Sequence, residues 1–304
     1  MTIDSLQTTF YGKPIRNFRP GDAVDALGSH TYRLAVDYDD EFDLVTLLDQ
    51  FLAKADLQRV EALVLGMWME AYESSIQPVL DRLIERRAEL PALRALFCGD
   101  MTYEECEISW IIQGSYKPLL DAFPALEVLR IRGSSGLEIA PFEHAALKQL
   151  AIECGGLPSA IVANLAQSRM PALEWLELWL GSENYGFDGD VQTYAVLLQA
   201  LDASRLRYLG LRDSEITDEL AVYLAAQPWL GQLDTLDLSL GTLGDAGAEA
   251  LYDSDGVRQL KRLDISHHYV SAEWLKLLRA MPITLVADDP QEADDEDRYV
   301  AVGE

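Results

Sequence analysis

Two adjacent histidines in the last quarter of the sequence have the residue types of a metal site. His267 and His268 follow Asp264, and imidazole nitrogens with a carboxylate oxygen are ligands that zinc accepts. In the alternative, His267 is a surface residue and His268 turns inward to bond the backbone of a turn. We favour this alternative and predict no metal site.

Two acidic stretches and the cysteines could also carry chemistry. Residues 181–191 hold oxygen donors of the kind that Ca²⁺ binds, without the spacing of an EF-hand. Residues 99–116 hold three glutamates that could act as general acids and bases. Solvated acidic loops are the simpler interpretation of both. The cysteines form no CxxC pair, and neither Cys106 nor Cys154 has a histidine nearby in sequence to activate it.

Motifs of nucleotide-binding and hydrolytic enzymes are missing from the sequence. It contains no GxxxxGK[ST], GxGxxG, HExxH or GxSxG pattern. We therefore predict no catalytic residue and no cofactor, and a protein that is not an enzyme.

The helices and strands that would position such side chains belong to a chain with the composition of a globular protein. Its 304 residues are 49% hydrophobic and 25% charged, which excludes wholesale disorder. The formal net charge of −27 repels phosphates, so we expect neither a nucleic-acid nor a membrane partner.

No apolar run approaches the roughly 20 residues that span a bilayer. Unpaired cysteines and the lack of a leader-like start favour a cytoplasmic location.

One repeat dominates the sequence. The pattern L-x-x-L-x-L begins at Leu126, Leu147, Leu173, Leu206, Leu233 and Leu260, with weaker copies at Val60 and Leu93 and a degenerate one around Leu34 and Val36. Helical stretches lie between the copies. A strand, a turn and a helix every ~27 residues form one solenoid unit, and such units must stack to bury their leucines.

This repeat resembles leucine-rich-repeat proteins of the ribonuclease-inhibitor-like type. The resemblance implies an α/β solenoid, a horseshoe with a parallel β-sheet on the concave face and α-helices on the convex face. The stretches Leu65–Trp68, Tyr208–Arg212 and His267–Tyr269 are similar to those of a bacterial, actinomycete-rich family of such proteins, over about residues 10–285. The resemblance implies no catalytic residues.

The domain organisation follows from the limits of the repeat. We expect an N-terminal cap over residues 1–30, which covers the leucine edge of the first repeat. Residues 31–287 should form the leucine-rich-repeat domain, with about nine repeats and a short C-terminal capping strand. Residues 288–304 are strongly acidic, and we expect a disordered tail there.

The repeat also predicts which side chains line the concave face. Side chains alternate along a strand, so positions 3, 5 and 7 of each repeat point there. Arg, Trp and Tyr, the types enriched at binding hot spots, gather in these columns. We predict that the partner-binding residues are Phe97, Arg130, Arg132, Trp175, Glu177, Trp179, Tyr208, Arg212, Asp213 and His267. In the alternative, Arg132 pairs with Glu153 and the Trp rings stack on Arg side chains or on each other.

Three functional hypotheses follow. The leading one is a non-enzymatic interaction module that binds a protein or peptide on the concave face. The second is a small-molecule- or metal-dependent enzyme that uses the loops at 99–116 and 181–191. The third is a structural accessory subunit of a larger assembly.

Overall fold

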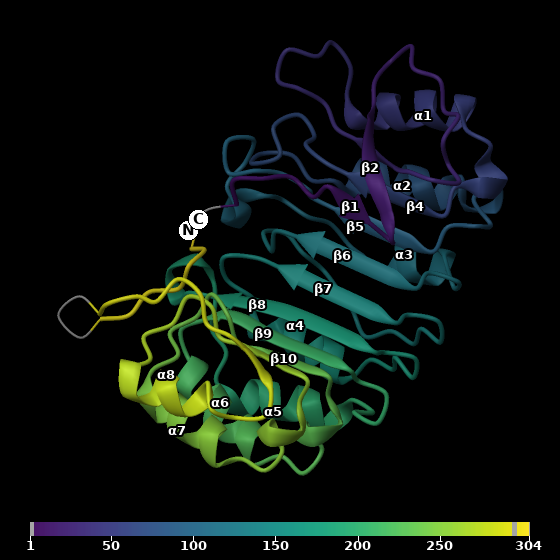
Figure 1. Ribbon diagram of the computed structural model, residues 1–304. Coiled ribbons are helices and arrows are strands. Elements are labelled where there is room, and N and C mark those ends of the chain that lie inside the picture. The colour runs from purple at the N-terminus through teal and green to yellow at the C-terminus, as the bar shows by residue number, and fades with distance from the viewer. Residues whose placement is uncertain (1–2, 294–296, 304) are drawn as a thin grey trace. The chain divides into compact units, whose positions relative to one another are not determined.

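The computed structural model describes residues 3–293 and 297–303. Within these ranges the chain divides into two compact units. The N-terminal unit comprises residues up to 152 together with 168–172, and the C-terminal unit comprises residues 153–167 and 173–303. Each unit contains a sheet with helices alongside it (Figure 1).

The strands of the N-terminal unit follow one another across the sheet in chain order. β1 and β2 form an antiparallel pair, and β2 to β6 pair in parallel. The strands are β1 (Thr9–Phe10), β2 (Lys13–Phe18), β3 (Thr31–Leu34), β4 (Ala62–Leu65), β5 (Ala95–Cys98), β6 (Val128–Arg132) and β7 (Gln149–Glu153), the last residue of which belongs to the C-terminal unit. The helices are α1 (Leu44–Lys54), α2 (Gln77–Glu85) and α3 (Lys117–Ala122), with short 3₁₀ turns η1 (Leu57–Arg59), η2 (Arg87–Glu89) and η3 (Ile108–Trp110).

The C-terminal unit repeats the same alternation with parallel strands. Its strands are β8 (Trp175–Gly181), β9 (Tyr208–Ser214), β10 (Thr235–Asp237), β11 (Arg262–Asp264) and β12 (Thr284–Val286). Its helices are α4 (Ser159–Ala166), α5 (Val191–Ala200), α6 (Thr217–Ala225), α7 (Asp245–Asp253) and α8 (Ala272–Leu278), with 3₁₀ turns η4 (Glu183–Tyr185), η5 (Leu230–Gln232) and η6 (Val257–Gln259).

The fold is therefore an α/β leucine-rich-repeat solenoid, and the register of its strands confirms the repeat. In the C-terminal unit, position 4 pairs in one row, Leu176 with Leu209, Leu236, Leu263 and Leu285. The first four of these leucines are fully buried. In the N-terminal unit Leu63, Leu96 and Leu129 form the equivalent row. Stacked identical positions let each leucine pack on the next one, so the core is continuous within each unit.

Local side-chain chemistry explains where some helices begin. Asp43 precedes α1, and its Oδ1 accepts a hydrogen bond of 2.7 Å from the backbone N–H of Thr46. Asp190 and Thr193 form a capping box at the start of α5. These hydrogen bonds favour the charged carboxylate, and they lower the pKa of both aspartates.

The N-terminal segment does more than cap an edge. β2 pairs with β3 at the edge of the sheet, where a cap is expected. The residues before it cross the sheet face of β4, β5 and β6, where Phe10 packs in one buried cluster with Val64 and Phe97. The repeat pattern gave no indication of this covering. Residues 1–2 of the expected cap lie outside the described residues.

The described part of the acidic tail is docked, in contrast to the disorder expected for residues 288–304. Ala301 and Val302 are 3% and 2% exposed. The Ala301 N–H donates to the carbonyl of Leu240 at 2.8 Å, and the Val302 N–H donates to Asp213 Oδ1 at 2.8 Å. Arg298 and Tyr299 hold the segment as well, because Arg298 Nη1 donates to Asp218 Oδ2 at 2.8 Å and the Tyr299 N–H donates to the Tyr269 hydroxyl at 2.8 Å. Residues 294–296 and 304 of the expected tail lie outside the described residues.

Candidate functional site

The strand register gathers the columns of the repeat into rows on one sheet face of the C-terminal unit. Trp175, Tyr208, Thr235 and Arg262 form one row, and Glu177, Gly210, Asp237 and Asp264 form the next. Trp179 lies beside Arg212 in a third row. We call this surface of β8 to β11 the C-terminal face. Its rows contain five of the ten residues expected to bind a partner.

An aromatic stack stands at one edge of the C-terminal face. The rings of Trp175 and Tyr208 are 3.4 Å apart at their centroids and 5° from parallel. A Cβ atom at Gly210 would lie 2.9 Å from the Tyr208 hydroxyl, so the glycine leaves the space that this ring occupies. Tyr208 is 7% exposed, whereas Trp175 remains 36% exposed. The stack therefore presents an indole to solvent on a fixed base.

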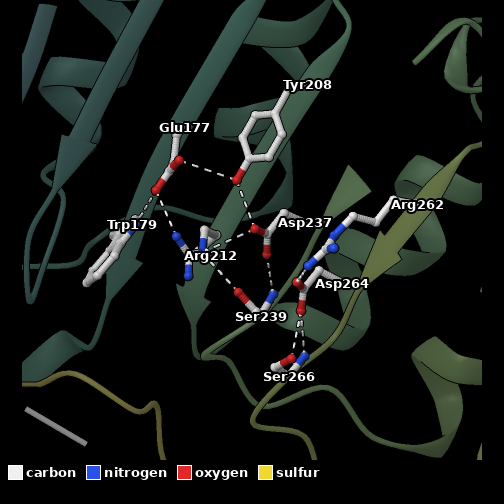
Figure 2. Close-up of polar contacts among 9 residues, drawn as sticks. All are labelled: Glu177, Trp179, Tyr208, Arg212, Asp237, Ser239, Arg262, Asp264 and Ser266. Carbon is white, nitrogen blue, oxygen red and sulfur yellow. Dashed lines mark hydrogen bonds and ion pairs between the residues drawn. The ribbon is translucent and has the colours of Figure 1, made fainter. Parts of the chain in front are cut away.

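Polar side chains next to the stack bond one another (Figure 2). The Tyr208 hydroxyl donates to Asp237 Oδ2 at 2.8 Å and lies 3.3 Å from Glu177 Oε2. Arg212 Nη1 donates to Glu177 Oε1 at 2.8 Å, and its Nε donates to Ser239 Oγ at 2.9 Å. Arg212 Nε also lies 3.5 Å from Asp237 Oδ2. One guanidinium thus links two strongly buried carboxylates.

The electrostatics of this network favour fixed protonation states. Burial raises the pKa of Asp237, and the positive charge of Arg212 opposes that rise. Burial, followed by the carboxylates of Glu177 and Asp237, raises the pKa of Tyr208, so its hydroxyl keeps its proton. Burial lowers the pKa of Arg212, but the same two carboxylates outweigh it and raise that pKa above its usual range. Tyr208 and Arg212 therefore act as hydrogen-bond donors at every physiological pH.

The two tryptophans expected to bind a partner differ in their surroundings. Trp179 is 6% exposed, its Nε1 donates to Glu177 Oε1 at 2.9 Å, and the Arg212 guanidinium lies 5.0 Å from its ring centre. Trp175 retains the exposed ring described above. These contacts are of the kind expected in the self-satisfied alternative, in which rings stack on Arg or on each other. Within the C-terminal unit, Trp175 is the tryptophan of the pair that is open to a partner.

A smaller group continues the network on β11. Arg262 Nη2 donates to Asp264 Oδ2 at 2.8 Å, and the Ser266 N–H and hydroxyl both donate to Asp264 Oδ1. Arg262 is exposed. Asp237, Asp264 and Arg262 lie outside the ten residues expected to bind a partner. Their places in the position 3 and position 5 columns were the signal that could have identified them.

The expected site residues of the N-terminal unit are mostly covered. Phe97 is fully buried and Arg132 is 2% exposed. The guanidinium groups of Arg130 and Arg132 lie 4.8 Å and 5.3 Å from the Phe97 ring centre. Arg132 Nη1 also donates to the carbonyl of Met101 at 2.7 Å. Sequence spacing placed these side chains on the correct face of the strands, but it did not reveal the covering segment. Their role in partner binding stays a prediction.

Asp213 lies near the end of β9, and His267 lies in the turn that follows β11. Both residues have a left-handed backbone, with φ of 51° and 60°, as does Leu240 at the equivalent position after β10. Asp213 is fully buried against the C-terminal segment. His267 Nδ1 lies 3.2 Å from Asp289 Oδ2. Their assignment to a partner-binding surface stays a prediction, but the Asp213 side chain offers a partner no surface.

His268 takes the turn role expected for it. It is fully buried, and its Nδ1 accepts a hydrogen bond of 3.1 Å from the backbone N–H of Val270. Burial lowers the pKa of His268 and so favours the neutral ring that this acceptor role requires. Among the residues that the structure describes, no group of three or more His, Cys, Asp or Glu side chains could hold a metal ion.

Acids of the two long loops are engaged in local structure, and Cys98, at the end of β5, and Cys106, in the first long loop, are buried. Glu105 Oε2 accepts from the Thr102 N–H at 2.8 Å, and Asp188 Oδ1 accepts from the Ser159 N–H at 2.6 Å. Burial raises the pKa of Cys98 to about 12 and that of Cys106 to about 11. Neither thiol is therefore activated as a nucleophile.

The stacked repeats define this chain as a leucine-rich-repeat protein. A protein from Bacteroides fragilis, known from its crystal structure, superposes with a TM-score of 0.81 and 32% sequence identity, over 89% of this chain and 76% of that chain. The chain belongs to the same family as this Bacteroides protein.

A second solved structure is much less similar to this chain. An internalin from Listeria monocytogenes aligns with a TM-score of 0.42 and 14% identity, over 87% of this chain and 62% of that chain. Likeness at that level does not define a shared fold, so the repeat geometry itself assigns the class. No protein-family model matches the sequence, and no protein of curated function does. None of the helices within residues 3–293 and 297–303 has the length and apolar character needed to cross a membrane.

Proposed function

We propose that the protein is a non-enzymatic interaction module that binds a protein or peptide on its C-terminal face. The observation that carries this proposal is the exposed Trp175 ring stacked on the buried Tyr208. A rigid aromatic surface loses little conformational entropy on binding, and Trp and Tyr are enriched among binding hot spots. Leucine-rich repeats commonly present such a sheet face to protein partners.

The chemistry around the stack suggests what the partner offers. The Glu177 and Asp237 carboxylates are already occupied by Arg212, whereas Arg262 is exposed beside the partly buried Asp264. A segment of mixed charge could place an apolar or aromatic side chain on Trp175 and polar groups against the Arg262 pair. The locked protonation states of Tyr208 and Arg212 support recognition over acid–base catalysis, because a general acid or base must exchange its proton near neutral pH.

Three further assignments belong to the same proposal. The helix that accompanies each strand of the C-terminal unit supports the ribonuclease-inhibitor-like type of repeat, and the sequence resemblance supports an actinomycete-rich bacterial family. Three free, buried cysteines suit a reducing compartment and support a cytoplasmic location. Acidic composition supports a partner that is neither nucleic acid nor membrane.

Selection from a displayed peptide library tests the proposed face. Peptides selected on the wild-type protein should bind the Trp175→Ala variant roughly 30-fold or more weakly, the loss typical of a hot-spot residue. Trp110→Ala is the matched control, because Trp110 is 54% exposed and lies in the N-terminal unit. Its binding should equal that of the wild type. Equal binding by a folded Trp175→Ala variant would contradict the proposal.

A further inference from the structure

The apolar character of one sheet face in the N-terminal unit sets it apart. Positions 3 and 5 of β4, β5 and β6 carry one charged residue, Arg130, and five apolar residues that we call the N-terminal face: Ala62, Val64, Ala95, Phe97 and Val128. The same positions in β10 and β11 carry Thr, Asp and Arg side chains. An apolar sheet face left open to water would be a binding surface or an aggregation site. The chain covers it with its own N-terminal segment, from which Phe10 joins the buried cluster and Tyr11 and Ile15 pack against it.

The covering segment is held like a bound peptide. Phe10 supplies one apolar anchor, 8% exposed, and its ring centroid lies 6.0 Å from that of Phe97. The backbone of Gln7 is bonded on both sides, because its N–H donates to Asp100 Oδ1 at 3.2 Å and its carbonyl accepts from Arg33 Nη2 at 2.6 Å. Recognition of main-chain groups plus one side-chain pocket is the usual way in which a groove binds an extended peptide.

Asp100 and Arg33 form a buried platform for that backbone. They are 0% and 6% exposed, and they bond each other directly. Because both charges are desolvated, their remaining hydrogen-bonding capacity must be met by other groups. The backbone N–H and carbonyl of Gln7 meet part of it, and any extended peptide could do the same, because every residue except proline carries both groups.

Phe10 is the one buried side chain of residues 3–11, and the carbonyls of Ile3, Thr8 and Phe10 accept hydrogen bonds from the Tyr103 N–H, the Ile15 N–H and the Thr31 hydroxyl. β1 has only two residues, and Asp4, Ser5, Thr8 and Thr9 are exposed. Tyr11 and Gly12, which join β1 to β2, both have positive φ, so a tight turn connects the segment to the sheet. Segments with few buried contacts open at a lower free energy than the core.

We propose that the N-terminal face is a second peptide-binding groove, that residues 3–11 occupy it intramolecularly, and that an extended segment with an aromatic anchor displaces them. The occupant is defined by the segment that the groove already holds. This occupant is an extended peptide. The backbone of one of its residues bonds Asp100 and Arg33, and an aromatic side chain follows three residues later. This groove is separate from the C-terminal face and does not rest on the function proposed for that face.

A fluorescent peptide with the sequence of residues 2–12 tests the proposal against the full-length chain. In the wild type, residues 3–11 compete with the added peptide for the groove. The Phe10→Ala substitution should weaken the binding of residues 3–11 to the groove. The peptide should therefore bind the Phe10→Ala chain at least about tenfold more tightly than the wild type, because removing a competing state raises the apparent affinity. Thr9→Ala is the matched control: Thr9 is exposed, and this variant should bind the peptide as the wild type does.

Two further measurements decide the outcome. The same peptide with its own phenylalanine changed to alanine should not bind, and hydrogen exchange in wild-type residues 3–10 should be faster than exchange in β4 and β5.

Concentration-dependent dimers that the free peptide dissociates would support the groove and would identify a second copy of this chain as its occupant. A Phe10→Ala chain that is folded by circular dichroism and binds the peptide no better than the wild type would overturn the proposal. Exchange in residues 3–10 as slow as in the core would overturn it too.

Discussion

The guanidinium of Arg212 lies 5.0 Å from the centre of the Trp179 ring. The same arginine donates to Glu177, which also accepts from the Trp179 indole N–H. A cation, a ring and a carboxylate therefore hold one another in place on the C-terminal face. This arrangement makes Arg212 and Trp179 part of the folded framework, and it leaves Trp175 as the exposed ring of that surface.

Arg212→Met should destabilise the fold by about 3–5 kcal/mol, because it leaves two buried carboxylates without their shared cation. Arg262→Met is the control: its ion pair with Asp264 is partly exposed and should contribute about 0–1 kcal/mol. Urea unfolding at neutral pH measures both changes. Burial already raises the pKa of Asp237, so the deficit of Arg212→Met should shrink as the pH falls and this carboxylate protonates. Equal losses in the two variants would show that the Arg212 network is not a stabilising one.

Leu236→Ala should cost about 2–5 kcal/mol through a cavity in the stacked leucine row, and Leu209→Ala should cost about the same. Both side chains are fully buried. Leu277, on α8, is 40% exposed and gives the control variant Leu277→Ala, with an effect within about 0.5 kcal/mol. Chemical denaturation measures all three variants. An unchanged midpoint for Leu236→Ala would mean that position 4 of the repeat does not carry the core.

Asp213→Asn should raise stability, and its advantage should grow with pH. Burial raises the pKa of Asp213 well above its usual value, against the opposing effects of the Val302 N–H and Arg212. A carboxyl group with a raised folded pKa contributes most to stability below about pH 4, and that contribution is lost as the pH rises through the folded pKa. Asn does not titrate, can still accept from Val302, and tolerates the φ of 51°.

Melting temperatures of the wild type and Asp213→Asn across the acidic and neutral range check this prediction. The two curves should converge at low pH and separate as the pH increases. Curves that stay parallel would mean that the Asp213 carboxyl group does not change its protonation state between the folded and unfolded chains.

A variant that lacks residues 297–304 should be less stable by about 1.5–3 kcal/mol, the value of burying one Val side chain. The truncation exposes the surface beneath Ala301 and Val302 and removes the N–H that Asp213 accepts from. Arg298→Ala serves as the comparison, because it removes a partly exposed ion pair with Asp218 and a hydrogen bond to the Thr242 carbonyl but leaves Ala301 and Val302 in place, and it should cost about 1 kcal/mol. Thermal unfolding measures both. A truncated chain as stable as the wild type would show that docking of the segment contributes nothing to folding.

The sequence by itself determined the fold class and the alignment of the strands. Leucines at positions 4 and 6 of each repeat alternate with other side chains along the strand. The six residues of the L-x-x-L-x-L pattern therefore specify where the strand lies, which of its sides is buried and how it aligns with the neighbouring strands. The rows that contain Trp175, Tyr208 and Arg262, or Glu177 and Asp237, follow directly from that spacing. Local periodicity is sufficient here because each repeat packs mainly on its neighbours.

Only the tertiary structure decided which of those side chains remain open. Gln7 bonds Asp100 across 93 positions of sequence, and Val302 bonds Asp213 across 89. No repeat encodes these contacts, because each depends on a single irregular segment that finds a complementary surface far away in the chain. The N-terminal segment buries Phe97, the C-terminal segment buries Asp213, and no such segment covers the ring of Trp175, which remains exposed. Spacing along a strand tells which side a residue faces, whereas long-range packing decides whether anything covers that side.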